Sequence, residues 1–150
     1  MRAVLQRVSQ ATVGINNELV AEIQQGLLVY LGIEQDDGNL QLDFMAKKIP
    51  RLRLFSDKEG KMNLSVQDVG GSILVVSQFT LCADLTKGNR PSFNPAATPE
   101  LAVTLYERLV EKLREQDIEV ATGIFGASMQ VSYTNDGPVT IILDSPANLK

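Results

Sequence analysis

The sequence predicts an α+β fold in which mostly antiparallel or mixed β-sheets form a barrel-like or layered core, with two main helices packed on it. Seven or eight segments have the apolar or alternating pattern of strands, and two have helical spacing. Because no regular helix separates one strand from the next, the pattern argues against a doubly wound fold. The chain has 150 residues, 44% of them hydrophobic and 21% charged, as in an ordinary globular domain. We therefore expect a single domain over residues 1–150.

The first part of the chain predicts three strands. Residues 2–8 are expected to form the first, the Asn16-Asn17 pair favours a tight turn, and residues 17–23 form the returning strand. Residues 27–33 are almost wholly apolar, which is typical of a strand covered on both faces. The sheet is therefore expected to start with an antiparallel pair and a buried strand.

The first helix is predicted between the turn residues 36–39 and Pro50. The turn offers N-cap chemistry, apolar residues then recur at helical spacing, and the proline ends the helix. Residues 51–55 alternate like a short strand, and residues 57–60 have turn composition. Residues 72–76 follow two glycines and form another apolar strand.

The second helix is predicted to begin at Thr98-Pro99-Glu100, after a loop over residues 84–97. A capping hydroxyl, a proline in the first turn and an acid near the positive end of the helix dipole all favour this start. Leucines at positions 101, 105, 109 and 113 then mark a core-facing stripe. Residues 127–133 alternate cleanly, and residues 139–143 complete the strands.

The composition excludes several classes of site. The chain has no histidine, so Ser-His-Asp and Cys-His triads cannot form. With one cysteine, Cys82, it cannot form an intramolecular disulfide or a zinc site of the usual N/S kind. No base lies near Cys82 in sequence, so we expect a small buried residue and not a reactive thiol. The composition leaves open an oxygen-only Mg²⁺ or Ca²⁺ site, but no EF-hand loop spacing appears, and we expect no metal and no cofactor.

The charge is uneven along the chain. The formal net charge is −4, which disfavours a protein that coats nucleic acid, and DNA is not an expected partner. Residues 47–61 nevertheless carry six basic residues against two acids, and this run is either a solvated face or a phosphate-contacting patch. The sequence has no signal-peptide pattern and no apolar run near the ~20 residues that span a bilayer. We therefore expect no membrane partner and a cytoplasmic location.

Polar residues follow the apolar strand at 72–76, in the order Ser77-Gln78-Phe79-Thr80-Leu81. The hydroxyls either satisfy backbone groups at the strand end or belong to a site. As nucleophiles, Ser77 and Thr80 would need an adjacent base, and none is near in sequence. Backbone N–H groups aimed at a developing oxyanion are a better use of such a turn.

Two loops are further candidates. Asn135-Asp136-Gly137-Pro138 has the composition of a hairpin turn, and its Gly-Pro bond is a place where a cis peptide is tolerated. Gly88-Asn89-Arg90-Pro91-Ser92-Phe93 places a base and an aromatic ring in a stiffened loop. That loop is either an ordered surface loop or a rim that contacts an anionic or nucleotide ligand.

SQFTL at 77–81 and NDGPVT at 135–140 resemble the two signature motifs of the D-aminoacyl-tRNA deacylases, long called D-tyrosyl-tRNA deacylases. The likeness covers the whole chain, with the opening MRAVLQRV, the GNRPSF loop and the stretch GIFGASMQVSY in matching order. Either motif alone is a weak signal, whereas both in order at this length are specific. Asn89 stands where the family often has a second arginine, and Tyr133 where a leucine is common.

The resemblance implies a homodimer with active sites at the subunit interface. Gly137-Pro138 would be a cis bond that reaches into the pocket of the other subunit, and Arg7 would hold that loop. The backbone amides of Phe79 and Thr80 would lie near the ester. The other implied pocket residues are Ser77, Gln78, Met129 and Asn135. The tRNA contacts expected from the basic run and the loop are Lys47, Lys48, Arg51, Lys87 and Arg90.

The implied activity is the hydrolysis of D-aminoacyl-tRNA, and of Gly-tRNA(Ala), by an editing enzyme that rejects L-aminoacyl-tRNA through a Gly-cisPro backbone filter. One backbone wall against the L position suffices for every side chain, and glycine, which lacks a Cβ, passes it. The absent histidine favours catalysis assisted by the ribose hydroxyl of the tRNA. The alternatives are a non-catalytic RNA-binding module and an esterase with Thr80 as nucleophile.

Overall fold

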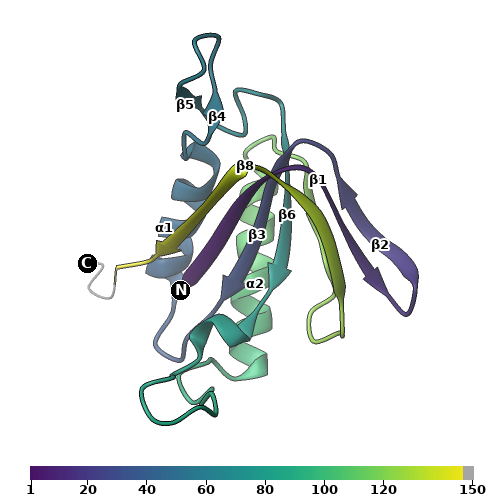
Figure 1. Ribbon diagram of the computed structural model, residues 1–150. Coiled ribbons are helices and arrows are strands. Elements are labelled where there is room, and N and C mark those ends of the chain that lie inside the picture. The colour runs from purple at the N-terminus through teal and green to yellow at the C-terminus, as the bar shows by residue number, and fades with distance from the viewer. Residues whose placement is uncertain (147–150) are drawn as a thin grey trace.

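The computed structural model describes residues 1–146 and shows strands that curl around each other with two helices against them (Figure 1). The elements, in chain order, are β1 (Arg2–Ile15), β2 (Glu18–Ile23), β3 (Gly26–Gly32), α1 (Asn39–Lys48), the 3-10 turn η1 (Ile49–Arg51), β4 (Phe55–Ser56), β5 (Met62–Leu64), β6 (Ser72–Ser77), the 3-10 turn η2 (Phe79–Cys82), α2 (Pro99–Arg114), β7 (Val120–Thr122) and β8 (Gln130–Asp144).

The long strand β1 organises the main sheet. Its first half pairs with β3, its second half pairs with β2, and β8 runs antiparallel along its other edge for nearly the whole length. The β3–β6 and β6–β7 pairs are parallel, so the six-stranded sheet is mixed. Because β1 changes partner half-way, the sheet bends into a nearly closed barrel (Figure 1). This confirms the predicted mixed, barrel-like core with two helices.

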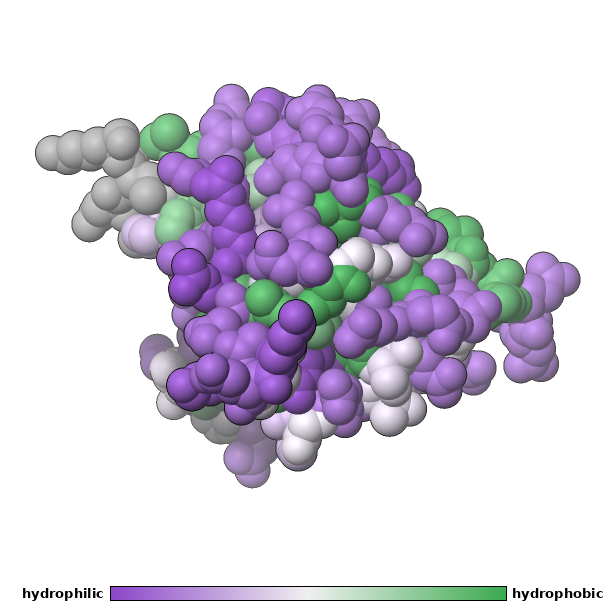
Figure 2. Space-filling view, turned by 90° about the horizontal axis from the view of Figure 1, so that it is seen from above, coloured by the Kyte–Doolittle hydropathy of each residue, from purple (hydrophilic) through white to green (hydrophobic). Residues whose placement is uncertain are grey.

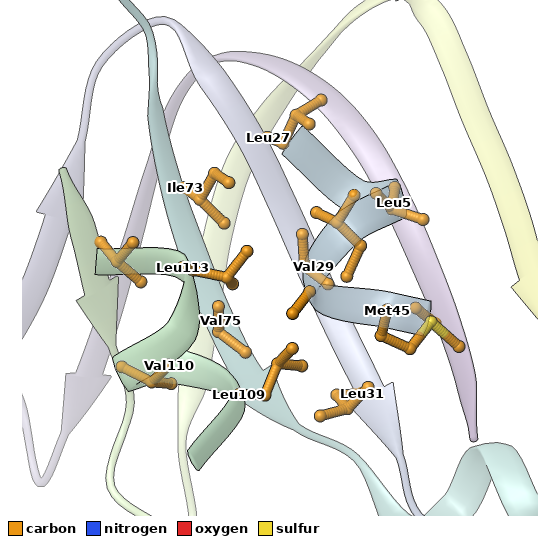
Figure 3. Packing of buried hydrophobic residues seen from close by; sticks show 14 of the residues in the cluster. Leu5, Leu27, Val29, Leu31, Met45, Ile73, Val75, Leu109, Val110 and Leu113 are labelled. Atoms are coloured by element: carbon orange, nitrogen blue, oxygen red, sulfur yellow. The ribbon is translucent and has the colours of Figure 1, made fainter. Parts of the chain in front are cut away.

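Apolar side chains fill both faces of the sheet. On the helix side, Val29 and Val75 of the sheet pack against Met45 of α1 and Leu109 of α2 (Figure 3). A smaller core fills the inside of the curl and consists of Val8, Ala11, Val13, Ile23, Leu28, Leu74 and Val76. Since β3 supplies residues to both cores, the prediction that residues 27–33 are covered on both faces is confirmed.

The two helices start as the sequence predicts. The Thr98 hydroxyl accepts a 3.5 Å hydrogen bond from the Leu101 N–H, and Pro99 occupies the first turn of α2. At α1, the Gln41 side chain accepts a 3.0 Å hydrogen bond from the Gly38 N–H. No helix among residues 1–146 is long and apolar enough to cross a membrane.

The prediction of a hairpin turn at residues 135–138 is wrong. β8 continues through them as one strand, and only its register with β1 jumps, from Thr140 opposite Gln6 to Asn135 opposite Val8. The side-chain oxygen Oδ1 of Asn135 accepts a 3.2 Å hydrogen bond from the Val139 N–H, which closes a bulge over residues 136–139. The chain therefore keeps its direction, and the bulge projects from the ladder.

Other strand predictions need smaller corrections. The first strand runs on to Ile15, whereas the strand expected at 127–133 begins only at Gln130. Residues 51–55 do not form the expected strand, because the chain leaves η1 and pairs only from Phe55. The Leu54 carbonyl is bound by the Arg7 side chain instead of a strand partner. The short strands β5 and β7 and the turn η2 were not predicted.

Candidate functional site

A cavity of about 520 Å³ opens where β6 ends. Ser77, Gln78 and Phe79 line one side of it, and Met129 lines another, just before β8 begins. The remaining walls are mostly small or apolar residues and include Ala97, Ala102, Phe125 and Val131. The cavity is thus an apolar hollow with polar groups at the strand end, which is the usual form of a site for a small organic group.

The turn after β6 presents two backbone donors, one on Phe79, which lines this cavity, and one on the next residue, Thr80, which does not line it. The last ladder bond runs from the Gln78 N–H to the Leu31 carbonyl at 2.8 Å, and the Leu81 N–H then donates to the Gln78 carbonyl at 3.2 Å. The N–H groups of Phe79 and Thr80 lie between these two and have no acceptor in the described part of the chain. Two adjacent free N–H groups at the start of a turn can stabilise negative charge on an oxygen.

The Thr80 side chain lacks the partner that a nucleophile needs. Its hydroxyl oxygen accepts a 2.5 Å hydrogen bond from the Gln78 amide nitrogen, and no carboxylate or amine of residues 1–146 bonds to it. An amide N–H donor cannot remove the hydroxyl proton. The arrangement therefore orients Thr80 and does not activate it.

Phe79, which lines the cavity, packs against a second aromatic ring, that of Phe93. The rings of Phe79 and Phe93 meet edge to face with centroids 5.1 Å apart, and Phe79 remains 56% exposed. The loop that carries Phe93 is closed by two hydrogen bonds between the backbones of Asp84 and Ser92, at 2.8 and 3.0 Å. This packing places the loop over residues 84–93 next to the Ser77-Gln78-Phe79-Thr80 segment.

The second motif forms the bulge of β8, and the Gly137-Pro138 peptide bond is cis. Arg7 holds the bulge. Its Nε donates to the Asp136 carbonyl at 3.1 Å and lies 3.2 Å from the Asp136 carboxylate, while its Nη1 donates to the Leu54 carbonyl at 2.7 Å. A Cβ on Gly137 would lie 2.8 Å from Arg7 Nη2, so only glycine fits there without a shift.

Within one chain, the bulge and the cavity lie apart. The bulge is opposite Arg7, which pairs with Leu27 near the start of β3, whereas Ser77 pairs with Leu31 near its end. Four residues of strand separate these positions by roughly 13 Å. Neither Gly137 nor Pro138 lines the cavity of its own chain.

The chain matches the model of a protein family described as D-Tyr-tRNA(Tyr) deacylase over residues 4–144. A D-aminoacyl-tRNA deacylase of Chlorobaculum tepidum is 56% identical, over 97% of this chain and 98% of the relative. One from Desulfotalea psychrophila is 52% identical, over 97% of each chain. The chain belongs to this family. Its members are hydrolases that act on aminoacyl-tRNA.

Two solved structures resemble the fold. A protein described as c-Myc DNA Unwinding Element Binding Protein superposes with a TM-score of 0.93 at 44% identity, covering 98% of this chain and 100% of that one. A probable eukaryotic D-amino acid tRNA deacylase superposes with a TM-score of 0.76 at 20% identity, covering 95% and 97%. The second likeness supports the fold alone.

The other predicted site residues are spread over the deacylase. Asn135 lies in the bulge, where its amide nitrogen also donates to the Thr140 hydroxyl at 3.1 Å, and not in the cavity. Lys47 and Arg51 line a shallow groove between α1 and α2. Lys87 and Arg90 are exposed on the loop beside Phe93. The structure thus brings the Ser77–Phe79 segment and Met129 together and leaves the bulge and the α1 cations elsewhere.

Sequence reasoning missed most of the cavity wall. Ala97 and Ala102 flank the start of α2, and Phe125 lies in the connection after β7. A run of alanines around a helix cap is a weak sign of space left for a ligand. The Cys82 prediction is confirmed, because the side chain is buried and desolvation raises its pKa to about 11.

Proposed function

We propose that the protein hydrolyses the ester of D-aminoacyl-tRNA at a site shared between two copies of the chain. The cavity beside Phe79 and Thr80 of one copy holds the aminoacyl-adenosine end, and Gly137-Pro138 of the second copy closes it. The observation that carries this proposal is the separation of the two motifs within one chain. The bulge is anchored by Arg7, yet Gly137 and Pro138 do not line the cavity that residues 1–146 of the same chain form.

A two-fold dimer explains this separation, because each bulge then enters the cavity of the other copy. Two exposed apolar side chains of β8 support the proposal, since Ile142 is 68% exposed and Tyr133 is 39% exposed on the strand that carries the bulge. Sedimentation at micromolar concentration should give a dimer. A fully active monomer would refute the shared site.

In the proposed mechanism, a water attacks the ester carbonyl carbon, and the N–H groups of Phe79 and Thr80 stabilise the oxyanion that forms. The bond to the ribose oxygen then breaks, and that oxygen leaves with a proton. The neighbouring ribose hydroxyl of the tRNA performs the proton transfer, since the site contains no histidine and no activated side chain. An aminoacyl ester is already reactive, so orientation and charge stabilisation supply useful acceleration.

The proposed chiral filter is the backbone of the bulge. Gly137 has no Cβ, so its backbone can approach the substrate closely. A carbonyl held against the substrate Cα leaves room for a hydrogen on that side and none for a side chain. L-aminoacyl-tRNA is rejected for every side chain, while glycine passes, so Gly-tRNA(Ala) is also a proposed substrate.

We place this editing activity in the cytoplasm, where the charged tRNA pool is used. Ser77, Gln78 and Met129 line the substrate cavity, and Asn135 supports the bulge. The proposed phosphate contacts of the tRNA are Lys47, Lys48, Arg51, Lys87 and Arg90.

The deciding experiment compares the deacylation of D-Tyr-, L-Tyr- and Gly-tRNA by the purified protein. We expect release of D-tyrosine and glycine and sparing of L-tyrosine. Tight tRNA binding without hydrolysis would favour the RNA-binding module instead. A trapped acyl-Thr80 intermediate, or full activity on tRNA that ends in 2′-deoxyadenosine, would favour the esterase with a side-chain nucleophile.

A further inference from the structure

The Arg7 guanidinium ties the bulge to the chain just before β4. It donates to the Leu54 carbonyl at 2.7 Å and to the Asp136 carbonyl at 3.1 Å, so both backbones lie against one side chain. Arg53 immediately precedes Leu54, and consecutive Cα atoms are about 3.8 Å apart. Arg53 and the β4–β5 hairpin therefore lie next to the bulge and stay next to it in any assembly of the chain.

Two of the three cations of this segment form no ion pair within residues 1–146, whereas the third, Lys61, lies 3.0 Å from the Glu59 carboxylate. Arg53 and Lys58 are exposed, and neither forms an ion pair with any residue in the range 1–146. The intervening Asp57 is occupied by its own turn, because its carboxylate accepts hydrogen bonds from the backbone N–H groups of Glu59 and Lys61, both at 2.9 Å. The positive charge is therefore available to an external anion.

One acid lies near Arg53 without forming a pair. Hydrogen bonds from the Ser65 backbone and hydroxyl hold the pKa of Asp68 below its ordinary value, and the charge of Arg53 adds to this effect. The Asp68 carboxylate receives these two bonds at 2.8 and 2.7 Å. Because the Asp68 carboxylate accepts hydrogen bonds from Ser65, it lowers the positive potential around Arg53 but does not form an ion pair with its guanidinium.

The hairpin lies at the opposite end of the molecule from its own cavity. In Figure 1 the β4–β5 hairpin and the bend of β8 are at the top, while β6 points downward to the segment that lines the cavity. Figure 2 looks onto this upper end and shows a largely hydrophilic surface. An acceptor end held in the cavity of the same chain would have to cross the length of the sheet to reach Arg53.

We propose that Arg53 and Lys58 bind acceptor-strand phosphates of a tRNA whose aminoacyl end lies in the cavity of the other subunit. This inference rests on the proposed shared site: if Gly137 of one copy enters the cavity of the second, the Arg7 link carries Arg53 to the mouth of that cavity. Lys87 and Arg90, on the loop beside Phe93, serve the cavity of their own chain. Each tRNA is then held by cations of both subunits.

The first test reverses both charges in the homodimer, with Arg53→Glu and Lys58→Glu. We expect KM for D-Tyr-tRNA to rise about tenfold with kcat unchanged, because phosphate contacts act equally on ground and transition states. The salt dependence of tRNA binding should also flatten, by about 0.7–0.9 in slope for each lost contact. Each single reversal is also compared with Arg108→Glu on α2, which changes the net charge equally at an exposed position bound only to Asn39 among residues 1–146, and which should leave KM unaltered.

The second test assigns the cations to a subunit, using mixed dimers. One subunit carries Gly137→Ala and the other carries Ala97→Trp, which fills its cavity. If the site is shared, this dimer keeps one working site, formed by the cavity of the first subunit and the bulge of the second. Loss of all activity would instead mean that the bulge serves its own chain, which overturns the shared site and this inference together.

The charge reversal is then placed on either subunit of the working mixed dimer. We expect KM to rise when Arg53→Glu and Lys58→Glu are in the Ala97→Trp subunit, which supplies the bulge, and to stay unchanged when they are in the Gly137→Ala subunit. The reverse result would show that the hairpin serves its own cavity, and no effect from either placement would show that it does not touch the tRNA. Both of these outcomes overturn the inference and leave the proposed function standing.

Discussion

Replacing Gly137 by alanine tests whether the bulge acts by close approach of its backbone. The added Cβ would lie 2.8 Å from Arg7 Nη2, 2.8 Å from Val139 Cγ2 and 3.1 Å from the Val139 nitrogen, and the residue has a φ of +128°. Cβ atoms essentially never come within 3.0 Å of heavy atoms outside their own and the adjoining residues, so the backbone or a neighbouring side chain must shift. The Arg7 side chain cannot move freely, because it already binds Leu54 and Asp136.

The expected cost follows from these contacts. An alanine held at such a φ costs on the order of 1–3 kcal/mol in the folded state. For a chain of this size, each kcal/mol lowers Tm by about 2–4 °C. The effect on activity should be larger than the effect on stability, since a shift of about 1 Å in a positioning group can reduce the rate about 100-fold. We expect Gly137→Ala to lose most deacylation of D-Tyr-tRNA or to lower the ratio of D- to L-Tyr-tRNA hydrolysis.

The assay measures kcat/KM on D-Tyr- and L-Tyr-tRNA together with the melting temperature. Gly70→Ala is the matched control, because Gly70 has a φ of +62° and no atom within 4 Å of its added Cβ. It should lower Tm and leave the D/L ratio intact. If Gly137→Ala has the rate and the chiral preference of the unmodified protein, the backbone of the bulge is not the filter.

Three further predictions concern Thr80, the α1 lysines and the β1–β8 ion pair. Thr80→Ala should deacylate D-Tyr-tRNA at a rate within about tenfold of the unmodified protein. A tRNA that ends in 2′-deoxyadenosine should be deacylated about 10²–10⁴-fold more slowly, because its hydroxyl transfers the proton. A larger loss for Thr80→Ala than for the deoxy tRNA in single-turnover assays would reject the mechanism. Replacing Lys47 and Lys48 by Glu should weaken tRNA binding and reduce the slope of log K against log salt concentration by about 0.9 for each lost phosphate contact. Unchanged binding curves would show that these lysines are only solvent-exposed and do not contact the tRNA. The Arg2 guanidinium, by hydrogen bond and then by charge, lowers the pKa of Asp144, so the stability from this pair is present above pH ~4 and is lost as pH falls through the lowered pKa. Urea unfolding should show Arg2→Ala about 0.2–1 kcal/mol less stable at pH 7, with a smaller difference near pH 2, and a difference independent of pH would contradict the assignment.

The fold was predictable from the sequence where a residue pattern is compatible with only one kind of local structure. The apolar run at residues 27–33 had to be covered on both faces, and Thr98 with Pro99 had to begin a helix. The pattern failed where a side chain replaced a strand partner. Arg7 takes the Leu54 carbonyl out of any ladder, and this contact between residues 47 positions apart in sequence leaves no local signal.

The sequence predicted which motifs belong to the site, but it did not predict how these motifs and the cavity wall are arranged in space. The polar residues after β6 and the free N–H groups of Phe79 and Thr80 follow from a strand that ends in a turn. Asn135 to Pro138 have the composition of a hairpin turn, and the hydrogen bonds from Val139 to the Asn135 side chain and from Arg7 to the Asp136 carbonyl hold them as a bulge. The cavity wall at Ala97 and Ala102 depends on how α2 docks on the sheet, which residue spacing does not specify.

The pairing of β1 with β8 has a consequence for synthesis of the protein on the ribosome. β1 is translated first, yet its strand partner β8 is translated last: Arg2 pairs with Asp144 and Val8 with Asn135. One edge of β1 therefore stays unpaired until nearly the whole chain has emerged. An open edge of that length invites pairing with other nascent chains. It also means that the bulge that Arg7 anchors is among the last parts to form. A prematurely terminated product that ends before β8 contains the Ser77–Phe79 strand end but lacks the bulge, and with it the proposed filter against L-aminoacyl esters.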